Sequence, residues 1–522
     1  MRTLLGNSNL LDKYEIIDDN TLSFKDKVLK FYEDIDFKTI NDFDHELKLS
    51  GDEVDCFKEY LESMRDSDER ILVVSDYDCD GICAYSIFSR LLDYLHIEHN
   101  YYIPSRSKEG YGINIDIVKR AKKYGFKAII TLDNGVVANE AIALAKEYGI
   151  DFLIIDHHNY ETRPEVKALI HPYVLDAYHG ACCASGLSYC FALNYYDDEY
   201  SSVLAGIATL ADMVEVFKAN RELIIRAYKR LKTMTNTPIN MFLGNKNDFE
   251  INDLNFKVIP KINAISRMDH LTNVNLFARF IKNEVVEDFT MLKRVEEIND
   301  LRKNISKDSA AKALNTKLNK NGIIVLKSKQ YLEGLCGLIA NQVMNKVKRP
   351  VIVLSELENC YKGSGRSPRQ FDIHQYLNAW EGEYLAFGGH AQAVGLTIDK
   401  KDINLFETYC GKALIGEDLS KTRVIEITMD DLTIENIEFL ESLAPYGQGF
   451  KEATFLLKDP MIRSKFLIKG LYPKYSLENG VEAICFDKDL YYDDVKGFIG
   501  QLSFNKFQAR RKINVSIDEI VL

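Results

Sequence analysis

The sequence has no paired C-x-x-C spacing, although it contains ten cysteines. Without that spacing neither a zinc site nor a disulfide framework is indicated, and we expect a reduced, cytoplasmic setting. No apolar run approaches membrane-spanning length, and the first residues lack the apolar core of a signal peptide. We therefore expect neither a membrane segment nor a secretory signal.

Basic residues are fewer than acidic residues in the chain as a whole. The formal net charge is −12, from 66 Lys and Arg against 78 Asp and Glu. This balance argues against a protein that coats nucleic acid. It leaves open a local basic cleft, and bound metal can reverse the sign of an acidic pocket. The hydrophobic content of 46% is that of a globular protein, and 522 residues suggest about three domains.

A repeating strand and helix pattern begins at residue 71. Apolar runs alternate with helical segments, of which the first carries Ala84, Phe88 and Leu91 on one face. The apolar runs are 71–76, 100–105, 127–133 and 151–156. This alternation predicts an α/β domain with a parallel, doubly wound sheet.

The rest of the chain divides by composition. Residues 284–319 lack Pro and Gly and predict a charged connecting helix, and a second, smaller α/β unit follows with glycine-rich turns at 362–367 and 387–395. From about residue 424 short strands predict a small β-barrel or sandwich. The predicted divisions are an N-terminal helical segment (1–70), a first α/β domain (71–280), a connecting helix (281–320), a second α/β domain (321–420) and a β domain (421–522).

Acidic residues collect where the predicted strands end. Three strands end in aspartate, at Asp76, Asp133 and Asp156. The carboxyl ends of parallel strands meet at one edge, so we expect these acids to converge. Asp78 and Asp80 follow at alternate positions in "SDYDCDG", where Gly81 would allow a tight turn into the next helix. One of these acids can be explained as a helix cap, but three in register indicate a bound cation.

Other polar residues extend this cluster. His157 and His158 directly follow Asp156, and Asp212 is the one charge in an apolar helical stretch. Each could be a turn or surface residue by itself, yet a buried Asp needs a partner or a metal. Carboxylates with imidazole suit Mn²⁺ or Mg²⁺. Two such ions about 3.5–4 Å apart would activate water and clamp a phosphoryl group, which predicts phosphoester hydrolysis.

These residues resemble the DHH phosphoesterase superfamily. Residues 76–81, Asp133, 156–158 and Asp212 are similar to its motifs I to IV, and "GGHAQAVG" resembles the glycine-rich motif of its DHHA1 domain. From about residue 70 onward the chain resembles the RecJ family of bacterial single-strand-specific 5′→3′ DNA exonucleases. Further similar segments are 102–112, 260–268, 362–367 and 444–450, the last of which belongs to the family's OB-fold β-barrel.

The resemblance implies roles for individual residues. Two Mn²⁺ ions, with Mg²⁺ as the alternative, would be held by Asp76, Asp78, Asp80, Asp133, His157 and Asp212. Asp133 would bridge the ions, Asp156 would orient an imidazole, and His158 would contact the scissile phosphate. His390 would lie on the substrate side of the metals. Substrate contacts are implied for Arg106, Tyr111, Arg267, Ser364, Arg366, Gly388 and Gly389.

The chain departs from the family pattern in its second α/β domain. Tyr331-Leu332-Glu333-Gly334 stands where the family has Trp-His-x-Gly, and Gln342 stands where an Arg is common. Ser266 replaces a usual Gly, and Val394 a usual Ala. The metal ligands are all present, while the phosphate-binding half has lost two polar groups.

The resemblance implies a monomeric, metal-dependent exonuclease on single-stranded DNA in repair and recombination, assisted by a single-strand-binding protein and a helicase. The OB-fold would supply aromatics for base stacking. One alternative is a DHH phosphoesterase for short oligonucleotides or nucleotide phosphates, against which the C-terminal β domain argues. The other is an inactive DNA-binding scaffold, which would be expected to have lost metal ligands.

Overall fold

The chain divides into two units in the computed structural model, Met1–Ile40 with Asp418–Leu522 and Asn41–Glu417. The structure describes residues 10, 13–19, 21–40, 43, 45–246, 248–284, 288–319, 321–416, 421–486, 491–505 and 511–522. The remaining residues, including the first nine and parts of the predicted connecting helix 284–319 and β domain 421–522, lie outside the described set.

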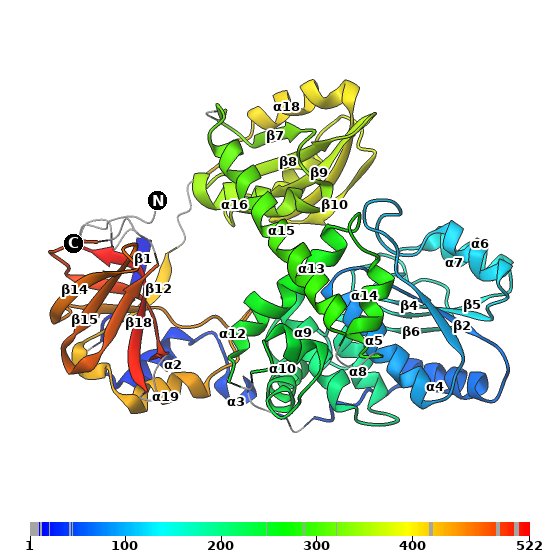
Figure 1. Ribbon diagram of the computed structural model, residues 1–522, viewed down its shortest axis with the longest axis horizontal. Helices are drawn as coiled ribbons and strands as arrows, with labels where there is room; N and C mark the ends of the chain where they lie inside the picture. The colour runs from blue at the N-terminus through cyan, green and yellow to red at the C-terminus, as the bar shows by residue number, and fades with distance from the viewer. Residues whose placement is uncertain are drawn as a thin grey trace. The chain divides into compact units, whose positions relative to one another are not determined.

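Short runs of largely buried, apolar residues form most of a five-stranded sheet in the larger unit, in the order β3-β2-β4-β5-β6, of which β3 is only partly buried (Figure 1). All neighbouring strands in it are parallel. Its strands are β2 (Ile71–Ser75), β3 (His99–Tyr102), β4 (Ala128–Leu132), β5 (Asp151–Ile155) and β6 (Ala168–Ile170). β2 and β4 are buried throughout, as in a parallel sheet covered on both faces. The predicted parallel, doubly wound sheet is confirmed.

Helices cover both faces of this sheet. Leu72 and Val74 share a core with the helices α6 (Ile115–Lys123) and α7 (Asn139–Glu147), whereas Ile71 and Val73 face the other way. The second face carries α4 (Asp52–Arg65), α5 (Cys79–Tyr94) and α8 (Ala184–Ala192). This split follows from the period of two along a strand. It leaves the carboxyl ends of the strands and the N-terminus of α5 at one edge.

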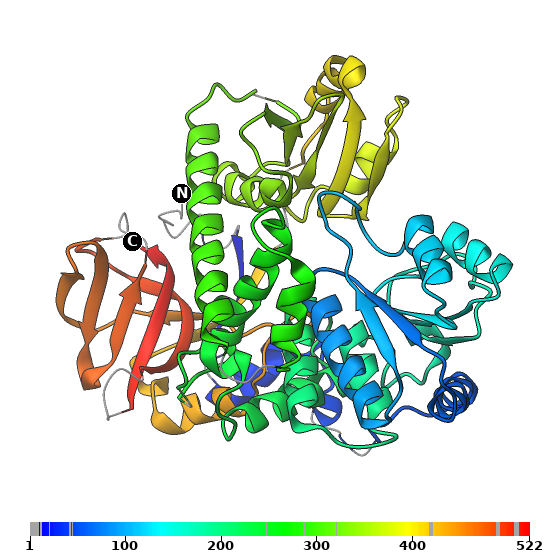
Figure 2. The same ribbon diagram turned by 45° about the vertical axis from the view of Figure 1, so that its right-hand side comes forward.

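A helical layer continues from α8 (Figure 2). It consists of α9 (Glu199–Ala211), α10 (Lys218–Leu231), α11 (Pro238–Phe242), α12 (Ile251–Asp253), the π-helix η2 (Leu254–Val258), α13 (Ile259–Arg267) and α14 (Val274–Ile281), with the short 3₁₀ turn η1 (Pro172–Val174) before α8. The connecting helix α15 (Phe289–Leu314) packs against α13 on one side and α16 (Cys336–Val347) on the other. Among the helices that the structure describes, none is long and apolar enough to cross a bilayer.

The second α/β domain is a five-stranded sheet in the order β10-β11-β9-β8-β7. β7 and β8 are parallel, and the other neighbours are antiparallel. The elements are β7 (Ile324–Ser328), η3 (Glu333–Leu335), β8 (Val351–Glu356), β9 (Cys360–Arg366), α17 (Ile373–Asn378), β10 (Ala386–His390), β11 (Ala393–Asp399), η4 (Lys400–Asp402) and α18 (Ile403–Gly411).

The two glycine-rich segments of this domain, predicted as turns, lie mostly in strands, and the turn is confined to residues 391–392 of the second segment. The segment 362–367 lies almost wholly in β9, and 387–395 forms most of the hairpin of β10 and β11. In the first segment, glycine is needed for close packing between strands. A Cβ on Gly363 would lie 1.9 Å from the Val353 carbonyl oxygen of the neighbouring β8.

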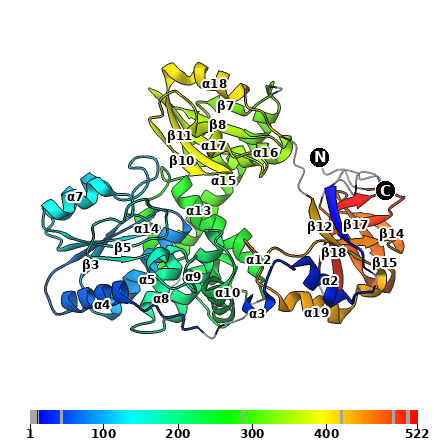
Figure 3. The same ribbon diagram turned by 180° about the vertical axis from the view of Figure 1, so that it is seen from behind.

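The smaller unit contains an eight-stranded sheet, seen from behind in Figure 3. Its strands in spatial order are β1 (Tyr14–Ile17), β12 (Thr422–Ile427), β13 (Phe455–Lys458), β17 (Gly497–Asn505), β18 (Lys512–Val521), β16 (Glu482–Cys485), β15 (Tyr472–Leu477) and β14 (Ile462–Ile468). The helices α2 (Phe24–Phe31), α3 (Phe37–Ile40) and α19 (Ile434–Ser442) and the turns η5 (Met429–Asp431) and η6 (Glu478–Gly480) complete it.

The first 70 residues do not form one helical segment. β1 pairs in parallel with β12, and Tyr14 donates a hydrogen bond of 2.8 Å to Glu519. Residues 1–40 therefore belong with the C-terminal sheet, whereas α4 packs on the parallel sheet of the larger unit. β1 has only four residues, too few for periodicity to distinguish a strand from a helix. Its partner strand lies some 400 residues away, so no neighbouring segment indicates the pairing.

Candidate metal centre and the adjoining cavity

Three aspartates follow neighbouring parallel strands, two of them at the point where the strand order reverses, between β2 and β4. Asp76 comes after β2, Asp133 after β4 and Asp156 after β5. The backbone N–H of Asp76 still donates to Leu132 O at 3.3 Å, and that of Asp133 to Ile155 O at 2.9 Å. The ladder therefore fixes these residues side by side, and all three are buried.

The stretch "SDYDCDG" positions its acids in different ways. Asp78 is the N-cap of α5, and its Oδ1 accepts hydrogen bonds from the backbone N–H groups of Asp80 (2.9 Å) and Gly81 (3.2 Å). Asp80 accepts hydrogen bonds from the backbone N–H groups of Ala184 (2.8 Å) and Ser185 (2.9 Å), at the start of α8. One acid thus caps each of two helices, and the negative charges lie at the positive helix ends.

Gly81 is required for a reason other than the predicted tight turn. It lies inside the first turn of α5 and does not have a positive φ. A Cβ at this position would lie 2.3 Å from the Asp76 carbonyl oxygen. The glycine therefore lets the helix start directly against the end of β2.

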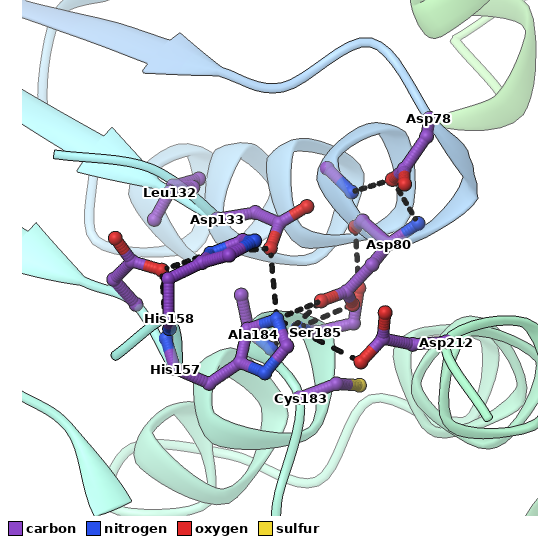
Figure 4. A network of polar contacts seen from close by, with 12 residues as sticks. Asp78, Asp80, Leu132, Asp133, His157, His158, Cys183, Ala184, Ser185 and Asp212 are labelled. Carbon is purple, nitrogen blue, oxygen red and sulfur yellow. Dashed lines mark hydrogen bonds and ion pairs between the residues drawn. The ribbon is translucent and has the colours of Figure 1, made fainter. Parts of the chain in front are cut away.

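Asp80, Asp133 and Asp212 converge on His157 (Figure 4). His157 Nε2 lies 3.2 Å from Asp133 Oδ1, 3.8 Å from Asp80 Oδ2 and 3.7 Å from Asp212 Oδ2. Asp212 is the residue that ends α9. Asp133 has a φ of 60°, which is uncommon for a residue other than glycine and directs its carboxylate into the cluster.

Asp156 holds His158 in place. Its Oδ1 accepts hydrogen bonds from His158 Nδ1 at 2.8 Å and from the backbone N–H groups of His157 and His158. The Tyr111 hydroxyl donates to Asp133 O at 2.9 Å and lies within 3.2 Å of both imidazole nitrogens of His158. Beneath them, His171 Nε2 hydrogen-bonds His158 O at 2.9 Å. Asp156 and Tyr111 thus orient the ring of His158, and His171 holds its backbone.

The pKa values in the cluster are strongly displaced. Burial, followed by the charges of neighbouring aspartates, raises the pKa of Asp76 and of Asp133 well above the usual range and that of Asp212 to about 8. Burial lowers the pKa of His157, so its imidazole is neutral at pH 7. Burial is the largest influence on His158 and opposes its charge, but the hydrogen bond to Asp156 and the charges of Asp156 and nearby aspartates together outweigh it, and the pKa rises to about 9.

The residues present fit a divalent cation. Asp76 Oδ1, Asp133 Oδ1 and His157 Nε2 are buried and have no hydrogen-bond partner among the described residues. Ligand atoms lie within 4.8 Å of one another in three overlapping sets, and these are Asp76/Asp78/Asp133, Asp80/His157/Asp212 and Asp133/His157/His158. Unpaired carboxylate oxygens beside a neutral imidazole form a donor set for Mn²⁺ or Mg²⁺.

A cavity of about 490 Å³ lies beside this cluster, within the larger unit. The first α/β domain contributes Tyr77, Arg106, Ser107, Gly110, Tyr111, Ser266, Arg267 and Asp269, and the second contributes Glu333, Gly334, Lys362, Gly363, Ser364, Ala386, Gly395, Leu396 and Thr397. Tyr111 belongs both to this lining and to the hydrogen bonds of His158. The cavity therefore adjoins the candidate metal centre.

One face of the second sheet forms part of the cavity wall. Lys362, Ser364 and Arg366 alternate along β9 and so share a face. Ser364 pairs with Gly395 of β11, which in turn pairs with Gly388 of β10. A Cβ added to either glycine would meet no atom within 4 Å. These glycines therefore leave the face open.

Gly389 and His390 take different positions from Gly388. Gly389 has a φ of 141°, and a Cβ on it would lie 2.2 Å from Ala393 O, so the hairpin itself requires glycine there. His390 is exposed at the end of β10 on the Gly388 face. Among the residues that the structure describes, it makes no hydrogen bond or ion pair with the acids of the cluster.

Cationic side chains crowd around the cavity. Burial, followed by the charges of Arg106, Arg302 and Arg366, lowers the pKa of Arg267 to about 9. The Arg366 guanidinium lies against Gly337 in the first turn of α16, where a Cβ would be 2.7 Å from its Nη2. Such a group of guanidinium ions is unfavourable unless an anion joins it.

The loop that carries Arg106 is braced by Asp269. Asp269 Oδ2 accepts hydrogen bonds from the Ser105 hydroxyl (2.7 Å), the Ser107 hydroxyl (2.8 Å) and the Ser107 backbone N–H (2.9 Å). Arg106 itself lies over the Tyr77 ring, 5.2 Å from its centroid. Asp269 is therefore engaged by the loop, and Arg106 is held at the cavity.

Sequence reasoning missed Tyr77, Lys362, Asp269 and Glu333. Lys362 could have been found from the alternation in "KGSGR", which places it on the face of Ser364 and Arg366. Glu333 had no such signal. Of the positions that depart from the family pattern, Ser266 lines the cavity, whereas Gln342 donates to Ser306 at 3.4 Å in the helix layer.

Comparison with known proteins agrees with this geometry. Models of the DHH family N-terminal domain, the DHHA1 domain and the RecJ OB domain match residues 70–213, 301–409 and 425–519. The single-stranded-DNA-specific exonuclease RecJ of Bacillus subtilis is 27% identical over 86% of this chain, and that of Escherichia coli is 25% identical over 86%. The chain spans 61% of the length of the first relative and 87% of the second.

A solved structure shows the same fold. RecJ of Thermus thermophilus in complex with Mn²⁺ superposes with a TM-score of 0.80 at 20% identity, covering 92% of this chain and 72% of that one. A RecJ bound to manganese matches with a TM-score of 0.62 over 72% of this chain. With its DHH, DHHA1 and RecJ OB domains in this order, the chain is a RecJ-like member of the DHH superfamily.

Proposed function

We propose that the chain is a divalent-metal-dependent exonuclease that hydrolyses single-stranded DNA from its 5′ end. The observation that carries this proposal is the pairing of an acidic, partly unpaired cluster with a cavity crowded by cations. Relatives named as single-stranded-DNA-specific exonucleases support the same substrate. DNA repair and recombination, in which helicases and strand-coating proteins expose single strands, would supply it.

Two ions, Mn²⁺ by preference, would occupy the cluster. Asp76, Asp78 and Asp133 would hold one, and Asp80, His157 and Asp212 the other. Asp133 would serve both, because its Oδ1 is unpaired and lies 3.2 Å from His157 Nε2. When bound, such ions supply an activated water and neutralise the charge that develops on the phosphate.

Residues of the chain would do the rest. His158, whose pKa of about 9 keeps it protonated, would donate to a non-bridging oxygen of the scissile phosphate. Asp156 would fix the ring and its charge through the 2.8 Å hydrogen bond. Tyr111, at hydrogen-bond distance from His158, would close the same side of the site.

The cation-lined cavity would receive the terminal phosphate. Arg106 and Arg267 line it with Ser364, and Arg366 lies on the same sheet face. Guanidinium groups suit such an oxyanion because they offer two parallel donors. Binding of the 5′ phosphate there would place the first linkage at the metal centre and define the polarity of digestion.

The smaller unit would bind the strand beyond the site. It matches a RecJ OB domain, and Phe466 of β14 and Phe486 are exposed on it. Lys474 lies 5.6 Å from the Phe466 ring centroid. Aromatic side chains beside lysines are the usual means of holding single strands without sequence preference.

End-labelled single-stranded DNA digested with Mn²⁺ would test the proposal. The arms are 5′-phosphorylated, 5′-hydroxyl and 5′-blocked strands, with 3′-blocked DNA and RNA as controls. Release of mononucleotides from 5′-phosphorylated DNA, lost when the 5′ end is blocked, is expected. Cleavage of dinucleotides alone would favour the short-oligonucleotide phosphoesterase, and binding without cleavage would favour the scaffold.

A further inference from the structure

Glu333 places a negative charge in a cavity wall whose other charged side chains include Arg106 and Arg267. Its Oε2 lies 3.0 Å from Lys362 Nζ across the cavity lining, between η3 and β9. The other carboxylate of the lining, Asp269, is already engaged by Ser105 and Ser107. Glu333 Oε2 has no such hydrogen bonds among the described residues, so its charge in the cavity wall is balanced only by Lys362.

The Glu333–Lys362 contact is a loose one. Glu333 Oε2 is buried, yet among the described residues no donor is aligned with it as a hydrogen bond, so the lysine contact is an ion pair only. Glu333 is 25% and Lys362 38% exposed in their side chains. An ion pair of this kind is weak enough for a phosphate to replace the carboxylate as partner of the lysine.

The lysine is well placed for that exchange. Lys362 precedes Ser364 and Arg366 on the same face of β9, so its ammonium lies along the row of groups assigned to the terminal phosphate. The backbone next to Glu333 is closely packed, because a Cβ on the following residue, Gly334, would be 2.2 Å from Arg267 O. Glu333 cannot move away easily and remains near the bound anion.

We propose that Glu333 sets how tightly the enzyme holds a terminal phosphate, by pairing with Lys362 in the free protein and opposing the phosphate once it is bound. This inference rests on the proposed role of the cavity. An exonuclease that starts at the 5′ end releases a nucleotide that still carries the phosphate held in this cavity. Glu333 lowers the affinity for that product and so hastens its release.

The test uses full-length protein and measures binding, which requires no cleavage. Calorimetric titration with thymidine 5′-monophosphate is compared with titration with thymidine. Glu333→Gln should bind the monophosphate about tenfold more tightly, which is about 1.4 kcal/mol, with no change for thymidine. In turnover, the same variant should show a lower KM for 5′-phosphorylated strands and stronger inhibition by added monophosphate.

A matched control is available in the same sheet domain. Glu356 is also 25% exposed in its side chain and pairs with Lys400 at 3.0 Å, but it does not line the cavity. Glu356→Gln should bind both ligands as the wild type does. Lys362→Met, the second variant, should weaken monophosphate binding about tenfold by removing the cation for which the two anions compete.

The inference is overturned if Glu333→Gln binds the monophosphate no more tightly than the wild type, or if thymidine gains equally. Should that variant not fold, unchanged monophosphate affinity in Lys362→Met overturns it instead. If the protein digests strands from the 5′ end but Glu333→Gln leaves monophosphate affinity unchanged, this inference alone is wrong. The expected binding changes without any DNA cleavage defeat the proposed exonuclease alone.

Discussion

His157 Nε2 lies 3.2 Å from Asp133 Oδ1, and both atoms are buried without a hydrogen-bond partner among the described residues. Asp133 reaches this position through a positive φ at the end of β4, and His157 follows β5 on the neighbouring strand. Two unpaired atoms held this close in a buried place are stable together when a cation lies between or beside them. This pair is therefore where the behaviour of the centre can be tested.

Removal of metal should abolish activity and lower thermal stability. Without cations, burial and mutual repulsion disfavour the charged form of the buried aspartates of the centre, and a metal that binds only the folded state stabilises it by about 2.7 kcal/mol at a concentration of 100 times Kd. EDTA-treated protein should therefore melt several degrees lower by calorimetry, and Mn²⁺ should restore both the transition and digestion. Full activity after exhaustive chelation would refute the metal centre.

Asp133→Asn should be more damaging than Asp78→Asn. Asparagine keeps the size but loses the charge, and a neutral amide bridges two cations poorly. We expect kcat of Asp133→Asn to fall roughly 10³-fold or more, as on loss of a major electrostatic stabiliser. High Mn²⁺ should partly rescue Asp78→Asn, whose carboxylate serves one ion. Equal losses, measured with folding and strand affinity retained, would show that Asp133 is not shared.

Arg366→Ala should reduce the preference for 5′-phosphorylated strands. A charge-assisted contact to phosphate contributes about 1.5–3 kcal/mol, so kcat/KM on phosphorylated DNA should fall tenfold or more. The 5′-hydroxyl strand is the internal control and should change little. If both substrates lose equally, the residue supports the fold through its 2.7 Å hydrogen bond to Gly365 O instead.

A fragment of residues 41–417 should keep the metal centre but lose affinity for long strands. It removes the smaller unit whole, including β1. Mn²⁺ binding and dinucleotide cleavage should persist, while filter binding of long single strands weakens. Removal of 418–522 alone is the informative comparison, since it would leave Tyr14 and Ile17 of β1 without β12 and favour aggregation. Parallel loss of dinucleotide and long-strand cleavage in the 41–417 fragment would contradict a separate strand-binding role.

Asp197→Asn should reveal a pH-dependent contribution to stability. The hydrogen bond from Arg230 Nη1 (2.6 Å), with further help from Tyr189 and Arg226, holds the pKa of Asp197 at about 2, below its ordinary 3.8. A lowered pKa stabilises the fold fully above pH 3.8 and loses this effect as the pH falls toward 2. Its side chain is 40% exposed, so we expect only about 1 kcal/mol near pH 7. Urea midpoints of variant and wild type should converge in acid, and a constant difference would refute the assignment.

Much of the first α/β domain could be predicted from the sequence. The runs at 71–76 and 127–133 are long, apolar and β-branched, so their strands and the aspartates that end them follow from local composition. The clustering of Asp76, Asp133 and Asp156 was predicted from the rule that parallel strands end at one edge, and the structure does bring these residues together. Which ions they hold stays a prediction.

Local glycine patterns were misleading for the second domain. Glycine usually marks a turn, but in "KGSGRS" Gly363 lies in a strand that closely approaches Val353 O, and in "FGGHAQAVG" Gly388 and Gly395 lie in strands with open space beside them. Similarly, one turn residue was expected at Gly81, where the structure instead has a helix starting against Asp76. Both errors arise because a missing Cβ permits bending and close packing alike, and sequence alone does not separate the two.

The sequence by itself determined the parallel sheet, the order of the domains and the acidic residues at the strand ends, because these depend on periodicity and on neighbours along the chain. Tertiary structure alone decided that β1 joins a strand some 400 residues away, that Asp80 caps α8, and that Glu333 faces Lys362. Each of these contacts joins segments distant in sequence. These contacts depend on how whole helices and strands pack, and local patterns of residue types do not predict that packing.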